Sequence, residues 1–143
     1  MDKDTKREPV VLVVDDDEAA MAAVVKLLGR RGFQMLTAPN GVEGLKILEE
    51  HREIDVIVLD VMMPRMTGLE VCAELRKRPH LIEIPVILLT GCDDLETRVA
   101  GMKLGISEFL CKPFSHLDLI DRINSQLHAR AIAKEISAVE RRL

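Results

Sequence analysis

Residues 54–60 read IDVIVLD, a short apolar segment that ends in an aspartate. From Val56 to Leu59 the apolar residues do not alternate with polar ones, which is typical of a strand buried on both faces of a parallel sheet. Ile54–Leu59 is therefore one candidate strand. Four other short apolar runs, most of similar composition, bring the candidates to five: Val10–Val14, Phe33–Ala38, Pro85–Leu89 and Ile106–Cys111.

Segments with helical spacing of apolar residues separate these runs. In the first, Met21, Val24, Val25 and Leu28 share one face, and Gly32 follows as a C-terminal stop. The later faces contain Leu45 and Leu48; Leu69, Cys72, Leu75 and, marginally, Val71; Val99 and Met102; and Leu117, Ile120, Ile123 and Leu127. Capping-box spacing occurs at Asn40 with Glu43, Thr67 with Glu70 and Asp93 with Glu96. Strand and helix alternate five times, which predicts a doubly wound α/β fold with right-handed crossovers.

The composition indicates one globular domain, because 48% of the 143 residues are hydrophobic and 31% are charged. A net charge of −4 and the lack of Trp and Tyr disfavour direct contact with nucleic acid. The charged N-terminus does not resemble a signal peptide, and no apolar run approaches the ~18 residues of a membrane span. The odd set Cys72, Cys92 and Cys111 predicts reduced thiols. We therefore expect a cytoplasmic protein without membrane contact.

Residues 129–143 continue the helical pattern beyond the fifth strand–helix unit, without Gly or Pro. Within them, apolar residues recur with the spacing of a short heptad stripe at Ile132, Ile136, Val139 and Leu143. The stripe fits two interpretations: a last helix that is simply extended and frayed, or a helix that leads to an output domain or forms a homodimer. We expect a tail over 1–8, a folded domain over 9–128 and a helical extension over 129–143.

Polar side chains follow four of the five candidate strands, where an open α/β sheet binds its ligands. The first run ends in Asp15, Asp16 and Asp17, and the third, fourth and fifth end in Asp60, Thr90 and Lys112. Each residue has an ordinary explanation when taken alone, such as Asp17 as a helix cap. With Asp17 set aside as a cap, the others together would place three carboxylates, a hydroxyl and an ammonium along one edge of the sheet.

The charges at this edge indicate the chemistry. Carboxylates ~5 Å apart repel by about 3 kcal/mol per pair at an effective dielectric of 20, and Lys112 alone is too little to offset three of them. A hard divalent cation is expected, and Mg²⁺ uses one or two carboxylates while keeping several waters. The cation, Lys112 and the Thr90 hydroxyl could then each contact a phosphoryl oxygen. The pattern predicts a phosphoryl-binding site that contains a carboxylate.

The motifs around these residues resemble those of the receiver domain of response regulators in two-component signal transduction, of the chemotaxis-regulator-like type. They are Val13-Val14-Asp15-Asp16, Val58-Leu59-Asp60-Val61-Met62-Met63-Pro64 with Gly68, Leu89-Thr90-Gly91 and Cys111-Lys112-Pro113. The resemblance covers about 9–128. It implies a flavodoxin-like fold: a five-stranded parallel sheet in the order 2-1-3-4-5, with five helices and an extended last one.

The resemblance also implies a role for each matching residue. Asp60 would accept a phosphoryl group from the phosphohistidine of a histidine kinase or phosphotransfer protein, and Lys112 would pair with Asp60 before transfer and with the phosphoryl group after it. The Lys112–Pro113 bond would be cis, which only an X–Pro bond allows at low cost. Mg²⁺ would be held by Asp15, Asp16, Asp60 and the backbone carbonyl of Met62.

The resemblance further implies a switch formed by Thr90 and Phe109. Thr90 would turn toward the phosphoryl group and Phe109 would rotate into the space that it leaves. These movements would alter the face formed by the fourth helix, fifth strand and fifth helix. Met62 and Cys92 stand where Glu, Asn or Gln could orient a hydrolytic water, so we expect slow self-dephosphorylation. The chain would be a phosphoacceptor signalling domain rather than an enzyme.

Three other functions suit the same architecture. An aspartate-nucleophile phosphatase would have a second acid two residues after the nucleophile, where this chain has Met62. A flavin or nucleotide binder would have a Gly-rich loop after the first strand, and this chain has three aspartates there. An interaction module that is never phosphorylated would not need the complete set of site residues.

Overall fold

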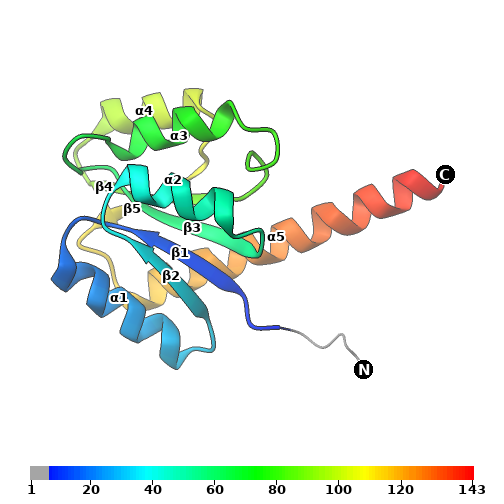
Figure 1. Ribbon diagram of the computed structural model, residues 1–143, viewed down its shortest axis with the longest axis horizontal. Coiled ribbons are helices and arrows are strands. Elements are labelled where there is room, and N and C mark those ends of the chain that lie inside the picture. The colour runs from blue at the N-terminus through cyan, green and yellow to red at the C-terminus, as the bar shows by residue number, and fades with distance from the viewer. Residues whose placement is uncertain (1–6) are drawn as a thin grey trace.

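The computed structural model in Figure 1 describes residues 7–143, so most of the predicted tail over 1–8 lies outside the described residues. The strands are β1 (Val10–Val14), β2 (Gln34–Ala38), β3 (Ile54–Asp60), β4 (Val86–Gly91) and β5 (Glu108–Lys112). The helices are α1 (Glu18–Arg30), α2 (Gly41–Glu50), α3 (Gly68–Arg76), α4 (Leu95–Lys103) and α5 (His116–Arg142). The predicted alternation of five strands and five helices is confirmed.

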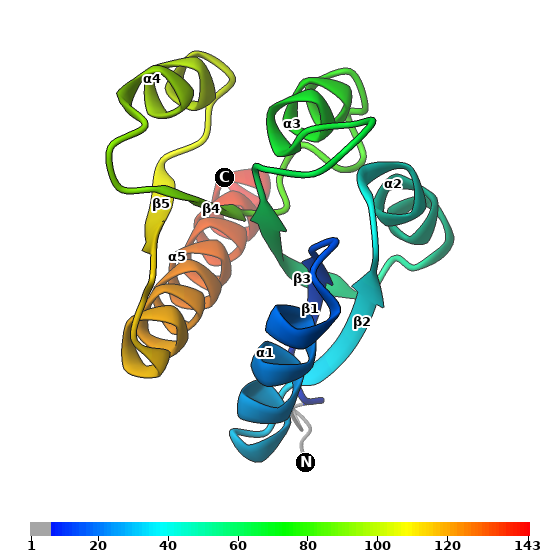
Figure 2. The ribbon, with the colours of Figure 1, turned by 90° about the vertical axis from the view of Figure 1, so that its left-hand side faces the viewer.

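All strand pairs are parallel, and the sheet has the order β2-β1-β3-β4-β5. This is the predicted flavodoxin-like order. The chain first moves from β1 outward to β2, then crosses back to β3 and continues to the other edge. Figure 2 shows the result: α1 and α5 cover one face of the sheet, and α2, α3 and α4 cover the other. The reversal of direction beside β1 places the ends of β1 and β3 side by side at a topological switch point.

The central strands are buried on both faces, which explains their lack of alternation. Along β1, Leu12 and Val14 belong to the core under α2 and α3, whereas Val11 and Val13 belong to the core under α1 and α5. All five residues of β1 are buried. Burial on both faces makes β1 and its neighbour β3 a rigid base for the residues at their carboxyl ends.

Most of the predicted helix ends are confirmed. The Asn40 side chain accepts a hydrogen bond from the backbone N–H of Glu43, and Thr67 forms a complete capping box with Glu70. Gly32 follows α1 with a positive φ of 87°, the conformation that favours glycine after a helix.

The predicted cap at Asp93 is wrong. The N-cap of α4 is Asp94, whose carboxylate accepts hydrogen bonds from the backbone N–H and the hydroxyl of Thr97. The carbonyl of Asp93 instead accepts a local turn hydrogen bond from the N–H of Leu95, so the helix begins one residue later than the spacing predicts.

The predicted buried face of α4 is wrong, and that of α5 is wrong at one position, Leu117. Val99 and Met102 of α4 are 41% and 58% exposed, and the buried residue of this helix is Gly101, against which the Phe109 ring lies. In α5, Leu117 is 61% exposed and Leu119 is buried in its place. Leu119, Ile120, Ile123 and Leu127 fall within an arc of about 100°, and Leu117 lies outside it.

The last helix continues well past the sheet, as Figure 1 shows and as the sequence predicts. Its projecting part exposes the stripe residues Ile132, Ile136 and Val139, which are 45%, 54% and 47% exposed. Arg130 holds the base of this part, because its guanidinium donates hydrogen bonds to the backbone carbonyls of Ile54 and Asp55. Across residues 7–143, no helix has the length and apolar character that crossing a membrane requires.

Candidate functional site

Four parallel strands deliver polar side chains to one edge of the sheet. Asp60 and Lys112 are the last residues of β3 and β5, Thr90 lies near the end of β4, and Asp15 directly follows β1. The strands are parallel and in register, so their carboxyl ends meet at the same edge. The sequence places these residues one by one, and the strand order brings them together.

A buried cluster of opposite charges lies at the centre of this edge. The Lys112 ammonium Nζ is 3.1 Å from Asp60 Oδ1 and 3.9 Å from Asp15 Oδ2. The side chains of Asp15 and Asp60 are each 5% exposed, whereas that of Lys112 is 38% exposed. One partly exposed ammonium thus faces two buried carboxylates, and the negative charge exceeds the positive charge.

The pKa of Asp15 is raised above its ordinary value. Burial is the main cause, and the nearby carboxylate of Asp60 adds to it. The backbone N–H of Asp17, which donates a hydrogen bond of 2.9 Å to Asp15, and the ammonium of Lys112 act in the opposite direction. Ionised Asp15 is therefore held at a cost that an additional cation would relieve.

The donor atoms of the cluster suit a hard divalent cation. Carboxylate oxygens of Asp15, Asp16 and Asp60 all lie within 4.8 Å of one another, and Asp16 is exposed to solvent. Two charges at such a distance repel by about 3–4 kcal/mol at an effective dielectric of 20, so a cation bound between them is strongly favoured. Oxygen ligands and an open, solvent-facing side fit Mg²⁺, which keeps several waters.

Asp17 does not join this cluster. It is the N-cap of α1, and its carboxylate accepts hydrogen bonds from the backbone N–H groups of Ala19 and Ala20. Its ordinary explanation as a helix cap is therefore confirmed, and the carboxylates of the cluster are those of Asp15, Asp16 and Asp60.

The loop after β3 packs tightly against the cluster. The backbone N–H of Met62 donates to Asp60 Oδ1 at 3.3 Å, and the Met62 side chain points to solvent with the residue 73% exposed. A Cβ atom on Gly68 would lie 2.6 Å from the backbone oxygen of Asp60 and 2.9 Å from the Cα of Val61. Only glycine lets α3 begin so close to the end of β3. The Lys112–Pro113 bond is cis, as the resemblance implies.

Thr90 and Phe109 lie on the side of the cluster that faces α4. Thr90 is 1% exposed, and its hydroxyl donates a hydrogen bond of 3.0 Å to the carbonyl of Gly91. Phe109 is partly buried and packs under α4, where a Cβ atom on Gly101 would lie 2.8 Å from the ring. The hydroxyl of Thr90 thus has a backbone partner.

The expectation of three reduced cysteines is wrong. Cys92 and Cys111 form a disulfide whose Cα atoms are 4.8 Å apart, and Cys72 is free and buried. The two partners are 19 residues apart in sequence, so their spacing carries no signal. They meet because β4 and β5 pair in a register that sets Thr90 opposite Cys111.

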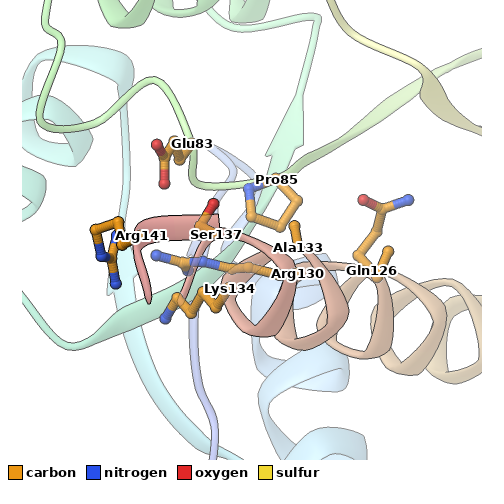
Figure 3. Close-up of a pocket in the computed structure, with 9 residues that line it drawn as sticks. Glu83, Pro85, Gln126, Arg130, Ala133, Lys134, Ser137 and Arg141 are labelled. Carbon is orange, nitrogen blue, oxygen red and sulfur yellow. The ribbon is translucent and has the colours of Figure 1, made fainter. Parts of the chain in front are cut away.

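A groove lies away from the cluster, at the opposite edge of the sheet. Figure 3 shows this groove, of about 600 Å³, between the projecting part of α5 and the segment before β4. Arg130, Lys134 and Arg141 line it from the helix, and Glu83 lines it from the segment. None of the residues in the acidic cluster contributes to it.

Comparisons with known proteins give a consistent result. Residues 11–124 match the family model described as "Response regulator receiver domain". The chain is 42% identical over 125 residues to "Probable transcriptional regulator ycf27" of Cyanidium caldarium, a match that covers 87% of this chain and 49% of that protein. It is 40% identical over 117 residues to "Response regulator MprA" of Mycobacterium sp. (strain KMS), a match that covers 82% of this chain and 50% of that protein.

The solved structures agree in fold. A response regulator receiver domain protein from Clostridium thermocellum superimposes with a TM-score of 0.81 at 33% identity, covering 87% of this chain and 98% of that one. The curated relatives are longer: this chain spans about half of their length.

Proposed function

The chain belongs to the response regulator receiver domain family of two-component signalling, and on this premise we propose that it is a Mg²⁺-dependent phosphoacceptor whose nucleophile is Asp60. The observation that carries the proposal is the buried Asp60 carboxylate, 3.1 Å from the Lys112 ammonium and beside a second buried carboxylate, Asp15. Such a site holds a nucleophile next to a fixed positive charge, and both are needed for phosphoryl transfer.

The proposed reaction is an in-line attack. A carboxylate oxygen of Asp60 attacks the phosphorus of a phosphohistidine on a histidine kinase or phosphotransfer protein. The new P–O bond gives an acyl phosphate, while the P–N bond breaks and its electron pair stays on the ring, which leaves as neutral imidazole because its other nitrogen already carries a proton. Lys112 then pairs with the phosphoryl group instead of the free carboxylate. Catalysis comes from position and charge neutralisation, because no side chain has to supply a proton.

The proposed cation ligands are the carboxylates of Asp15, Asp16 and Asp60 and the backbone carbonyl of Met62. When bound, Mg²⁺ would supply positive charge to the phosphoryl oxygens. The chain's own contribution is to keep Asp15 and Asp60 buried and close. The repulsion between them then favours a cation before the phosphoryl donor arrives.

The proposed switch begins at Thr90. Its hydroxyl exchanges the Gly91 carbonyl for a phosphoryl oxygen, a stronger acceptor because it carries charge. The inward movement leaves space for the Phe109 ring, which now lies against Gly101 of α4. Departure of the ring loosens the packing of α4, whose outer face exposes Leu95, Val99 and Met102. We propose this face, with β5 and α5, as the surface that a partner reads.

The phosphorylated state is proposed to be long-lived. Met62 is exposed near the acceptor, and its thioether cannot orient a water for hydrolysis as a carboxylate or amide can. Cys92 is equally unsuited. The chain would catalyse its own phosphorylation and slow dephosphorylation, without turning over an external substrate.

We propose a receiver unit over 9–128 and a connecting helix over 129–143 in a cytoplasmic protein. The matched part of this chain covers about half the length of each relative, and one of them is named a transcriptional regulator. The exposed stripe with Ile132, Ile136 and Val139 would lead to an output domain or pair with a second copy. Nucleic acid would be contacted only by such an output domain, because the chain carries a net charge of −4.

The direct test is an intact mass after incubation with Mg²⁺ and acetyl phosphate. We expect one added phosphoryl group in the wild type and none in Asp60→Asn, which keeps the shape but is not a nucleophile. Asp17→Asn is the matched control, because it removes a neighbouring charge and retains a capping side chain. An adduct that persists in Asp60→Asn, or that forms equally well with EDTA, would refute the proposal.

A further inference from the structure

The disulfide joins the segment next to Thr90 to the segment next to Lys112, two residues of the proposed phosphoryl site. Cys92 is two residues after Thr90, and Cys111 is directly before Lys112. The register of β4 and β5 sets Thr90 opposite Cys111 and Gly91 opposite Lys112. The Cys92 sulfur lies 3.7 Å from the backbone oxygen of Lys112. The bond therefore connects the loop that follows the switch residue to the strand that carries the cation.

The surroundings of the pair suit a bond that forms and breaks reversibly. Cys92 is exposed to solvent, so a small molecule can reach it. Arg98 of α4 donates from Nη2 to the Cys111 sulfur at 2.9 Å. A guanidinium beside a sulfur stabilises its thiolate, the form that attacks a disulfide. The Cα atoms are 4.8 Å apart, within the range of about 4.4–6.8 Å that a disulfide requires, so the bond can form without backbone movement.

We propose that Cys92 and Cys111 are a redox switch that controls phosphorylation of Asp60, with a low-molecular-weight disulfide such as glutathione disulfide as the oxidant. This inference rests on the proposed function. The oxidised pair holds the site in its unphosphorylated arrangement, and the reduced pair releases it.

The redox step is a pair of thiol–disulfide exchanges. The Cys92 thiolate attacks one sulfur of the small disulfide, which expels one thiolate and leaves a mixed disulfide. The Cys111 thiolate then attacks the Cys92 sulfur and expels the second small thiolate. In total the protein loses two electrons and two protons, and the small disulfide becomes two thiols. A small dithiol or thiol reverses both exchanges.

The coupling to phosphorylation runs through the backbone between Thr90 and Cys92. The hydroxyl of Thr90 donates to the carbonyl of Gly91, and this bond must break before the hydroxyl can turn to a phosphoryl group. Attachment of Cys92 to β5 holds the Gly91 carbonyl in reach of that hydroxyl. Oxidation therefore favours the free site over the occupied one. By thermodynamic reciprocity, occupation of the site makes the disulfide easier to reduce.

The test measures the affinity for beryllofluoride with Mg²⁺ in the reduced and the oxidised protein. Calorimetry is suitable, because the chain has no Trp or Tyr to report binding. We expect the reduced protein to bind at least about fivefold more tightly, the lower end of typical coupling between sites. Cys92→Ser should bind like the reduced protein under both conditions. Cys72→Ala is the matched control and should keep the difference.

Alkylation with N-ethylmaleimide at pH 8 verifies the redox state independently. Cys92 and Cys111 should be labelled only after reduction. Cys72 should resist labelling in the folded protein, because burial raises the pKa of its thiol to about 12. Intact mass counts the added groups.

Each other outcome is decisive. Equal affinity in the two redox states overturns the switch and leaves the phosphoacceptor function standing. A redox dependence that survives in Cys92→Ser, or a protein that glutathione disulfide does not oxidise at these two cysteines, also overturns it. Absence of both beryllofluoride binding and phosphorylation in either state refutes the proposed function, and the switch with it.

Discussion

The two edges of the sheet both collect charged side chains, but they hold them differently. At the carboxyl edge, Asp15 and Asp60 are 5% exposed and share one ammonium. At the amino edge, Lys134 and Glu83 face an open groove and are exposed to water. Water screens the second set, whereas burial keeps the first set at a high electrostatic cost. We therefore expect chemistry at the carboxyl edge, where the charges are buried and unbalanced, and not at the open groove.

The largest expected effect tests how tightly the carboxyl edge is built. Gly68→Ala should destabilise the protein by about 3 kcal/mol, the upper end for overpacking, because the new Cβ meets backbone atoms that cannot move aside. Urea unfolding followed by circular dichroism measures it. Gly29→Ala, in α1, meets only the flexible end of Met35 at 3.6 Å and should stabilise by up to about 1 kcal/mol. Equal effects at both positions would show that the edge is no more tightly packed than a surface helix.

The next effect tests the imbalance of charge at the same edge. Because burial and Asp60 raise the pKa of Asp15, the folded protein binds a proton there more readily than the unfolded chain. Ionised Asp15 therefore costs stability, and the cost appears as the pH rises through the raised pKa. At pH 7 without divalent cations, Asp15→Asn should raise the free energy of unfolding by about 1–2 kcal/mol. This is less than the full repulsion between the carboxylates, because the substitution also removes the attraction between Asp15 and Lys112.

Addition of Mg²⁺ should make the wild type more stable than Asp15→Asn, the reverse of their order without the cation. The wild type should gain about 2.7 kcal/mol at a Mg²⁺ concentration of 100 times Kd, and Asp15→Asn should gain far less. Glu83→Gln removes the same charge at the amino edge, and its stability should change by less than about 0.5 kcal/mol with or without Mg²⁺. Urea unfolding of the three proteins at each Mg²⁺ concentration checks this. If Glu83→Gln behaved like Asp15→Asn, the two edges would not differ in the way proposed.

The smallest effect is expected at the groove. Lys134→Ala removes one exposed ammonium, and unfolding stability should stay within about 0.5 kcal/mol of the wild type. The yield of the phosphoryl adduct by intact mass should also stay the same. A clear loss of either would give the amino edge a role that its exposure does not predict.

Much of the fold follows from local sequence signals. The unbroken apolar runs predict β1 and β3, and the caps at Asn40 and Thr67 are correct because both bonds join residues three apart. These signals are reliable because each depends on neighbouring residues only. The polar residue at the end of each strand is visible for the same reason, although its neighbours in space are not.

Most of the errors concern features that depend on distant parts of the chain, and one is local. The buried side of α4 is set by Phe109 from β5, which needs the place of Gly101, so Val99 and Met102 turn outward. The helical spacing of apolar residues predicts which of them share a face, but not which other element packs against that face. A cap one residue later, at Asp94, is an equally local alternative that the spacing did not separate from Asp93.

The sequence by itself determined the alternation of strands and helices and the chemical character of each strand end, because hydrophobic period and turn chemistry are local. The tertiary structure alone decided which of those ends meet. The order β2-β1-β3-β4-β5 and its register bring the Lys112 ammonium within 4 Å of the carboxylates of Asp15 and Asp60, and leave Asp17 outside the cluster. It also paired Cys92 with Cys111 across 19 residues. Distance in space, burial and the resulting pKa of Asp15 depend on packing between elements, which no single stretch of sequence contains.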